Sequence, residues 1–118
     1  MFTVLLVDDD PPQLRTRELV LRSQGWSVRV ATNASSALAL VRSTNHLALV
    51  ITDHNLAGDF GSDLVRELRQ IRPDMPVLVL SGMPGIEQDY AGLNVEIRIK
   101  PLPPDELISL VKSCISAG

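Results

Sequence analysis

The sequence has little of what disulfide-stabilised, zinc-binding or membrane-spanning proteins require. Its 118 residues include a single cysteine, Cys114, and only two histidines. One cysteine excludes an internal disulfide, and no Cys/His set has the spacing of a zinc or redox site. No apolar stretch reaches the roughly 18 residues of a membrane helix, and no signal peptide precedes the first strand-like run. We therefore expect no membrane partner, and a cytoplasmic location for the chain or for a larger protein containing it.

Positive charge is also sparse. Eleven lysines and arginines face 14 acidic residues, which gives a net charge of -3 at pH 7. The basic residues form no run that could follow a phosphate backbone, so the sequence predicts no direct nucleic-acid partner. With 45% hydrophobic and 21% charged residues, the composition favours one globular domain spanning residues 1–118.

Short apolar runs alternate along the chain with segments of helical periodicity. Residues 3–7, 47–52 and 77–80 are almost continuously apolar, which is typical of strands covered on both faces. Residues 27–31 and 95–100 instead alternate apolar with polar side chains, which indicates half-covered edge strands. The sequence thus predicts three interior strands and two edge strands.

Four helices are predicted between and after these strands. The first covers residues 11–24, because Asp10 followed by two prolines favours a helix start and Gly25 a stop. Residues 82–94 allow at most a brief helix. Arg66, Arg69 and Arg72 run along one side of the third helix and are predicted to form a solvated face. Apolar residues recur at helical spacing in the other three helices: Ala34, Ala37, Leu38 and Val41; Leu64, Val65, Leu68 and Ile71; Leu107, Leu110, Val111 and Cys114.

This alternation predicts an α/β fold, a single-domain flavodoxin-like (βα)5 sandwich. Its parallel five-stranded sheet would have the order 2-1-3-4-5, with right-handed crossovers and helices on both faces. Ligands of such sheets bind beyond the carboxyl ends of the strands. The polar residues that follow the strands are therefore the candidates for a functional site.

Each strand near the switch point of this sheet ends in a reactive polar group. Asp8 and Asp9 follow the first strand, Asp53 the third, Ser81 the fourth and Lys100 the fifth. Three carboxylates at one edge suit a hard divalent cation such as Mg²⁺, which also supplies the positive charge that an acidic cluster needs. A lysine and a hydroxyl beside that cation can hold the oxygens of a phosphoryl group.

In this order, Asp8-Asp9, Asp53, Ser81 and Lys100-Pro101 resemble the receiver domain of bacterial two-component response regulators, including receivers fused to hybrid sensor kinases. The resemblance covers the whole chain and implies a signalling domain that assists its own phosphorylation and dephosphorylation, not an enzyme with a separate substrate. It implies that Asp53 accepts a phosphoryl group from a histidine kinase phosphohistidine. The implied partners are a histidine kinase or phosphotransfer protein and a downstream effector or fused output domain, with a homodimer left open.

The resemblance also assigns roles around the acceptor. Asp9 would bind Mg²⁺ directly and Asp8 through water, while Asp53 and the backbone carbonyl of Asn55 would complete the protein ligands. The Ser81 hydroxyl would bond a phosphoryl oxygen. Lys100 would pair with the phosphate, and its peptide bond to the following proline would be cis.

Two departures from the family pattern bear on signalling. Ile97 stands where many receivers carry a tyrosine or phenylalanine that rotates inward when the hydroxyl residue engages phosphate. The interval from Ser81 to Lys100 is also shorter than in chemotaxis-type receivers. Both departures favour signalling through loop order in place of ring rotation.

Two other interpretations are open from the sequence. Asp8 and Asp10 after the first strand, followed by Ser81 and Lys100, also resemble the haloacid-dehalogenase phosphatases, with Asp8 as nucleophile and Asp10 as acid/base. That family expects a further acidic motif after its lysine, whereas here the best candidate precedes Lys100. The other interpretation is a degenerate receiver that acts only as a binding module.

Overall fold

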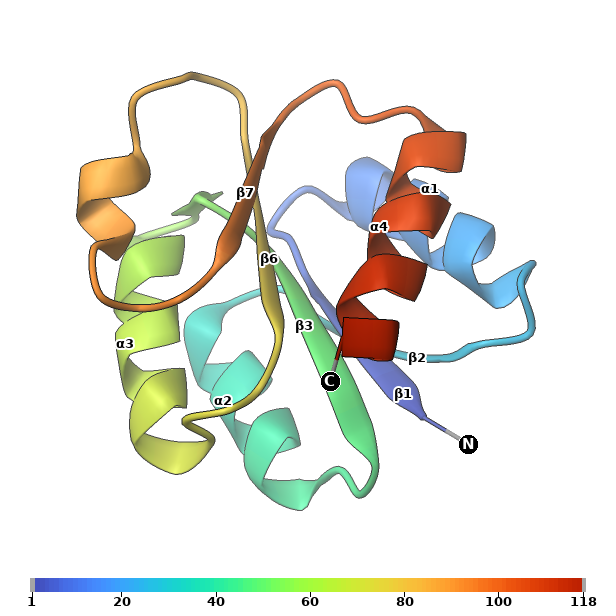
Figure 1. Cartoon of the computed structure of the whole chain (residues 1–118), viewed down its shortest axis with the longest axis horizontal. Coiled ribbons are helices and arrows are strands. Elements are labelled where there is room, and N and C mark those ends of the chain that lie inside the picture. Colours follow the sequence, from blue (N-terminus) through green and yellow to red (C-terminus); the bar gives the residue numbers. More distant parts are fainter. Residues whose placement is uncertain (1, 118) are drawn as a thin grey trace.

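The computed structural model describes residues 2–117 and contains a five-stranded sheet between two layers of helices (Figure 1). The sheet is parallel throughout and has the strand order β2-β1-β3-β6-β7. This is the predicted order 2-1-3-4-5, because β4 and β5 form a separate hairpin. The elements are β1 (Thr3–Val7), α1 (Pro11–Arg22), β2 (Ser27–Ala31), α2 (Ala34–Ser43), β3 (Leu47–Asp53), β4 (Asn55–Leu56), β5 (Asp59–Phe60), α3 (Gly61–Ile71), β6 (Val77–Ser81), η1 (Glu87–Tyr90), β7 (Glu96–Ile99) and α4 (Pro104–Ala117).

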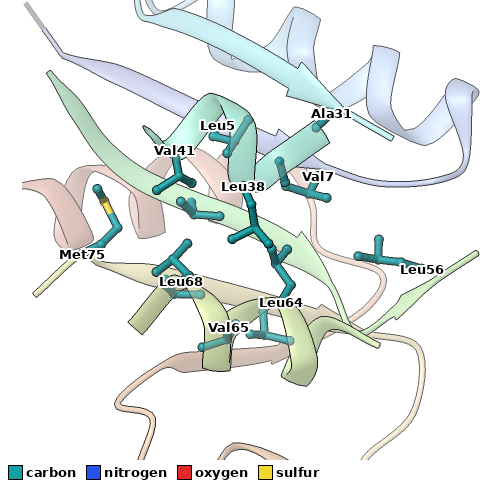
Figure 2. Packing of buried hydrophobic residues seen from close by; sticks show 14 of the residues in the cluster. Leu5, Val7, Ala31, Leu38, Val41, Leu56, Leu64, Val65, Leu68 and Met75 are labelled. Atoms are coloured by element: carbon teal, nitrogen blue, oxygen red, sulfur yellow. The ribbon is translucent and has the colours of Figure 1, made fainter. Parts of the chain in front are cut away.

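Helices α2 and α3 cover one face of the sheet, and α1 and α4 cover the other (Figure 1). Successive residues of a strand point to opposite faces, so Leu5 and Val7 of β1 join one core cluster while Val4 and Leu6 join the other. This double coverage is why the interior strands read as continuous apolar runs. Figure 2 shows the cluster under α2 and α3, including Leu38, Val41, Leu64, Val65 and Leu68.

Helix α1 begins as predicted but ends two residues earlier than predicted. Asp10 is its extended N-cap, and Pro11 stands in the first turn, where its missing N–H costs no hydrogen bond. The helix ends at Arg22 because the chain then turns: the amide of Gly25 donates to the Arg22 carbonyl, and Gly25 has a φ of 82°. A left-handed residue there stops the helix, and glycine adopts that conformation without strain.

A small hairpin that the sequence did not predict follows β3. Strands β4 and β5 pair antiparallel and lead directly into α3 at Gly61. The amide of Gly61 donates to the His54 carbonyl at 2.6 Å. A Cβ at Gly61 would lie 2.5 Å from the Asp53 carbonyl oxygen and 2.8 Å from the Tyr90 hydroxyl oxygen. The start of α3 therefore approaches the end of β3 so closely that only glycine fits.

The segment between β6 and β7 contains the brief helix that was expected, η1, and is held by arginines of α3. Arg69 was predicted to belong to a solvated face, and this prediction was wrong. Its guanidinium is partly buried among backbone carbonyls beside α3 and donates hydrogen bonds to them. Buried backbone acceptors are rarely left unpaired, and Arg69 supplies their donors. Arg66 is exposed, as predicted. The guanidinium of Arg69 donates to the carbonyls of Arg72, Met75, Leu93 and Asn94.

The last element that the structure describes is α4, which has 14 residues and is the longest of the described helices. It follows a loop in which the Lys100–Pro101 peptide bond is cis, as the family resemblance implied. Among residues 2–117, no helix combines the length and the apolar character needed to cross a membrane.

Candidate functional site

Three carboxylates meet at the carboxyl edge of the sheet. Asp8 follows β1 and Asp53 ends β3, and these strand ends are neighbours because Val7 pairs with Thr52. One side-chain oxygen from each of Asp8, Asp9 and Asp53 lies within 4.8 Å of the others. Asp8 and Asp53 are buried, whereas Asp9 is exposed. The structure thus brings together the three acids that the sequence analysis assigned to one edge.

Two cations face these acids. The Lys100 ammonium lies 3.3 Å from Oδ1 of Asp53, which is where the sequence analysis expected it. The Arg17 guanidinium lies 3.2 Å from the same oxygen and 2.8 Å from Oδ2 of Asp8. Sequence reasoning missed Arg17 and assigned the neutralising charge to a metal ion alone.

Gln13 connects the two cations through one side chain. Its carbonyl oxygen accepts from the Arg17 guanidinium at 3.1 Å and from the Lys100 ammonium at 3.4 Å. Its amide nitrogen donates to Asp10 at 2.7 Å. Gln13 and Arg17 are four residues apart on α1 and so share one helix face, which was the signal in the sequence that could have identified them.

The surroundings of Asp53 act on its protonation in opposite directions. Burial, a side-chain hydrogen bond with Asp8 and the Asp8 charge raise the pKa of the Asp53 carboxyl, and its net value, with every neighbouring charge included, is about 7. The charges of Arg17 and Lys100 lower the pKa of Asp53. Without additional positive charge, Asp53 therefore titrates near neutral pH, and a further cation would favour its ionised form.

Ser81 ends β6 at the same edge of the sheet. Leu80 pairs with Asp53, so the next residue, Ser81, stands beside the end of β3. The Ser81 side chain is buried, and its hydroxyl donates to the Met83 carbonyl at 2.7 Å and accepts from the Met83 amide at 3.1 Å. In this structure the hydroxyl is thus paired within its own loop.

Asn55 and His54 follow Asp53 and lie in different surroundings. Asn55 is exposed and begins β4. The His54 side chain is buried, with Nδ1 2.8 Å from the Tyr90 hydroxyl oxygen and Nε2 3.6 Å from an Asp89 carboxylate oxygen. Burial raises the pKa of the Tyr90 hydroxyl, with the Asp89 charge as a second cause, so this group stays protonated at neutral pH. Sequence reasoning did not identify this pair.

A buried aromatic residue of this region is Tyr90, whereas residue 97 is an isoleucine. Ile97 lies on β7 and is a partly buried aliphatic side chain packed against the core cluster under α2 and α3. Tyr90 is buried in the same cluster and reaches the end of β3 through His54.

The donor set at this edge fits a hard divalent cation. Carboxylate oxygens are the ligands that Mg²⁺ uses in proteins, usually one or two together with several waters. Asp9 is exposed and can bind a metal ion that arrives from solvent. The Asp8 side chain is fixed by a hydrogen bond, because its Oδ1 accepts from the Asp10 amide at 2.9 Å. A carboxylate flanked by two cations can also receive and hold an anionic phosphoryl group.

Comparison with protein-family models matches residues 4–112 to the response regulator receiver domain. The chain belongs to this family. It is a receiver domain of two-component response regulators, and the family match gives no support to the haloacid-dehalogenase interpretation.

Curated relatives of this receiver domain are response regulators. The probable transcriptional regulatory protein TcrX of Mycobacterium tuberculosis is 31% identical over 116 residues, which cover 96% of this chain and 49% of TcrX. The cell cycle response regulator CtrA of Brucella ovis is 30% identical over 115 residues, which cover 95% of this chain and 49% of CtrA. The receiver domain therefore spans about half the length of the curated relatives it matches.

Solved structures confirm the predicted fold. A CheY-like response regulator receiver domain protein from Methanospirillum hungatei superimposes with a TM-score of 0.91 at 23% identity, covering 99% of this chain and 95% of the other. A response regulator receiver protein from Pseudomonas putida gives a TM-score of 0.88 at 29% identity, covering 95% and 96%. The flavodoxin-like strand order predicted from the sequence is that of CheY-like receivers.

Proposed function

We propose that this receiver domain accepts a phosphoryl group on Asp53 from the phosphohistidine of a histidine kinase or phosphotransfer protein. The observation that carries the proposal is the placing of Oδ1 of Asp53 between the Lys100 ammonium and the Arg17 guanidinium, in a pocket of further carboxylates. In the transfer, a carboxylate oxygen of Asp53 forms a bond to phosphorus and the P–N bond of the phosphohistidine breaks. The imidazole leaves and takes up a proton.

A magnesium ion would be held by Asp8, Asp9, Asp53 and the backbone carbonyl of Asn55. Three clustered carboxylates support this assignment. When bound, the ion neutralises the charge that develops on the transferring phosphoryl group. Asp53 must be ionised to act as the nucleophile, and the positive charges of Lys100 and Arg17 lower its pKa in that direction.

Lys100 and Ser81 would bind the phosphoryl group on Asp53 and so respond to phosphorylation. A phosphoryl group adds about -1.5 to -2 charge and three strong acceptors. Lys100 already points at the carboxyl group that would carry this charge. The Ser81 hydroxyl would exchange the Met83 carbonyl for a phosphoryl oxygen, so the loop carrying the exposed Met83 would reorganise. Phosphorylation would thus bias a pre-existing equilibrium of this loop.

The output surface would lie on β7, where Ile99 is half exposed, and on α4 beside it. An effector protein or a fused output domain would bind there, and a second copy of the chain could use the same surface. Two of the relatives are named as regulators of transcription or of the cell cycle. We infer that residues 1–118 act as the receiver domain of a cytoplasmic signalling protein of comparable organisation.

The experiment is to incubate the protein with Mg²⁺ and acetyl phosphate and to measure its intact mass. The unmodified sequence and the control Asp59→Asn, which changes an exposed acid of the hairpin, should gain one phosphoryl group. Asp53→Asn should gain none, and chelation of the metal should strongly reduce the adduct.

Other outcomes would replace the proposal with a different function. Binding of a partner without any adduct on the unmodified sequence would indicate the degenerate receiver that acts only as a binding module. Steady hydrolysis of phosphate esters that requires Asp8 but not Asp53 would indicate a phosphatase.

A further inference from the structure

The acidic pocket contains a cation that belongs to the chain itself. The Arg17 guanidinium contacts Oδ2 of Asp8 at 2.8 Å and Oδ1 of Asp53 at 3.2 Å. The Arg17 side chain is 15% exposed, and those of Asp8 and Asp53 are 2% and 4% exposed. Salt and water screen a sheltered contact of this kind far less than an exposed ion pair.

Arg17 reduces the electrostatic repulsion between the carboxylates of Asp8 and Asp53. Carboxylates within 4.8 Å of one another repel strongly where solvent is excluded, and a guanidinium between two of them removes most of that repulsion. Gln13 accepts a hydrogen bond from the same guanidinium at 3.1 Å and so fixes its orientation. Helix α1 therefore supplies one of the two cations that face the acids, Arg17, and also Gln13, which holds that cation in place.

The same contacts bear on metal binding. Arg17 occupies one oxygen of Asp8 and one of Asp53, two of the three carboxylates that a divalent cation would share. Two cations bound to the same carboxylates repel each other, so each weakens the binding of the other.

We propose that Arg17 is an internal counter-ion that competes with the divalent cation for Asp8 and Asp53 and thereby sets the metal affinity of the site. The inference rests on the metal site of the proposed function. In the metal-free domain, Arg17 holds the pocket together. When metal binds, the guanidinium leaves the two carboxylates.

The structure offers space for the displaced side chain. A groove of about 580 Å³ runs beside α1 toward the loop before α4, and Arg17 stands at its border. Thr16 and Val20 of α1 and Leu102 and Leu107 of the facing segment contribute to its walls. The long apolar stem of arginine can lie along such a surface while its charged head reaches water.

The test compares metal binding by the full chain and by three variants. Arg17→Gln removes the charge, Arg17→Lys keeps the charge without the planar fork, and Arg15→Gln is the control. Arg15 lies on the same helix but is 66% exposed and pairs with Glu18. The affinity for Mn²⁺ is measured from the loss of the free-ion electron paramagnetic resonance signal, and that for Mg²⁺ by competition.

Arg17→Gln should bind both ions at least about tenfold more tightly than the unmodified sequence, Arg17→Lys should lie between them, and Arg15→Gln should match the unmodified sequence. Thermal unfolding gives a second measurement. In EDTA, Arg17→Gln should melt below the unmodified sequence, and saturating Mg²⁺ should raise its Tm by more than it raises that of the unmodified sequence.

A measurement on the unmodified sequence applies even if Arg17→Gln does not fold. The guanidinium hydrogens of Arg17 should exchange slowly with solvent in EDTA, as followed by nuclear magnetic resonance of labelled arginine, and rapidly with Mg²⁺. Equal or weaker metal binding by both Arg17 variants, or slow exchange that persists in Mg²⁺, would overturn the proposal. If neither the unmodified sequence nor any variant binds metal, the metal site of the proposed function is itself wrong and the inference falls with it.

Discussion

Nδ1 of His54 lies 2.8 Å from the hydroxyl oxygen of Tyr90, and this contact joins the residue after Asp53 to the segment between β6 and β7. The His54 amide also donates to the Leu80 carbonyl at 2.8 Å, so backbone and side chain connect the same point to β6 and to η1. Residue 97 is an isoleucine, and the aromatic rings that lie against His54 are those of the buried Tyr90 and the exposed Phe60. A change in the loop after β6 would therefore alter the position of His54 at the end of β3 through the His54–Tyr90 hydrogen bond.

Replacing Tyr90 by phenylalanine should remove this buried hydrogen bond and keep the ring. We expect the free energy of unfolding to fall by about 1 kcal/mol, because the His54 ring nitrogen would lose its partner. Urea denaturation of Tyr90→Phe, His54→Phe and the double variant measures the coupling. A double variant whose loss equals the sum of the two single losses would contradict the interaction.

Replacing Gly61 by alanine should destabilise the domain by at least about 2 kcal/mol. The new Cβ would meet the Asp53 carbonyl oxygen at 2.5 Å, and backbone at that distance must move. Gly82→Ala is the matched control, because a Cβ at Gly82 has nothing within 4 Å. Thermal unfolding that shows equal losses for the two variants would show that the start of α3 does not approach β3 as described.

The raised pKa of Asp53 predicts a pH-dependent stability in the absence of metal. The folded state binds a proton at Asp53 with a pKa of about 7, above the value of about 3.9 in an unfolded chain. The contribution of this group is therefore fully present below pH 4, declines as the pH rises toward 7, and is constant above that.

Asp53→Asn removes this dependence. At pH 8 in EDTA the variant should be more stable than the unmodified sequence by more than about 1 kcal/mol, and this difference should shrink toward pH 5. The exposed Asp59→Asn should show no comparable trend. Denaturant titrations at pH 5 and pH 8 measure this difference in unfolding free energy. A stability advantage of Asp53→Asn that grows toward acid pH would mean that folding lowers the pKa of Asp53.

Arg69 should contribute more to stability than its place in the sequence suggests. Its guanidinium donates to carbonyls of four residues, so Arg69→Ala would leave partly buried acceptors unpaired and should cost about 2–3 kcal/mol. Arg66→Ala, on the same helix but at an exposed position, should cost less than about 1 kcal/mol. Similar urea midpoints for the two variants would indicate that Arg69 lies on a solvated face, as its sequence pattern predicted.

The sheet and the acidic cluster could be predicted because both follow from short-range patterns. Helices cover both faces of the interior strands β3 and β6, so these strands have continuous apolar runs that the sequence shows clearly. Each of the two strands ends only one residue later than predicted. Residues placed directly after parallel strands must meet at one edge, which brings Asp8, Asp9 and Asp53 together.

The remaining features depend on how elements approach one another. Strands of two residues, such as β4 and β5, are too short to carry a periodic signal. Arg17 was missed because its four-residue spacing from Gln13 shows only that the two share a face of α1, and which face meets the acids depends on how the helix packs on the sheet. Arg69 was misjudged because two of its acceptors, the carbonyls of Leu93 and Asn94, lie in a loop whose path the sequence pattern does not show.

Asp53 itself should carry the phosphoryl group. The most direct measurement is to treat the phosphorylated domain with sodium borohydride, which reduces an aspartyl phosphate to homoserine, and to locate the change by peptide mass spectrometry. We predict homoserine at position 53 alone, and none after omission of the phosphodonor. Homoserine at position 8 or 9, or a phosphoryl group that survives borohydride on another residue, would show that Asp53 is not the phosphoacceptor.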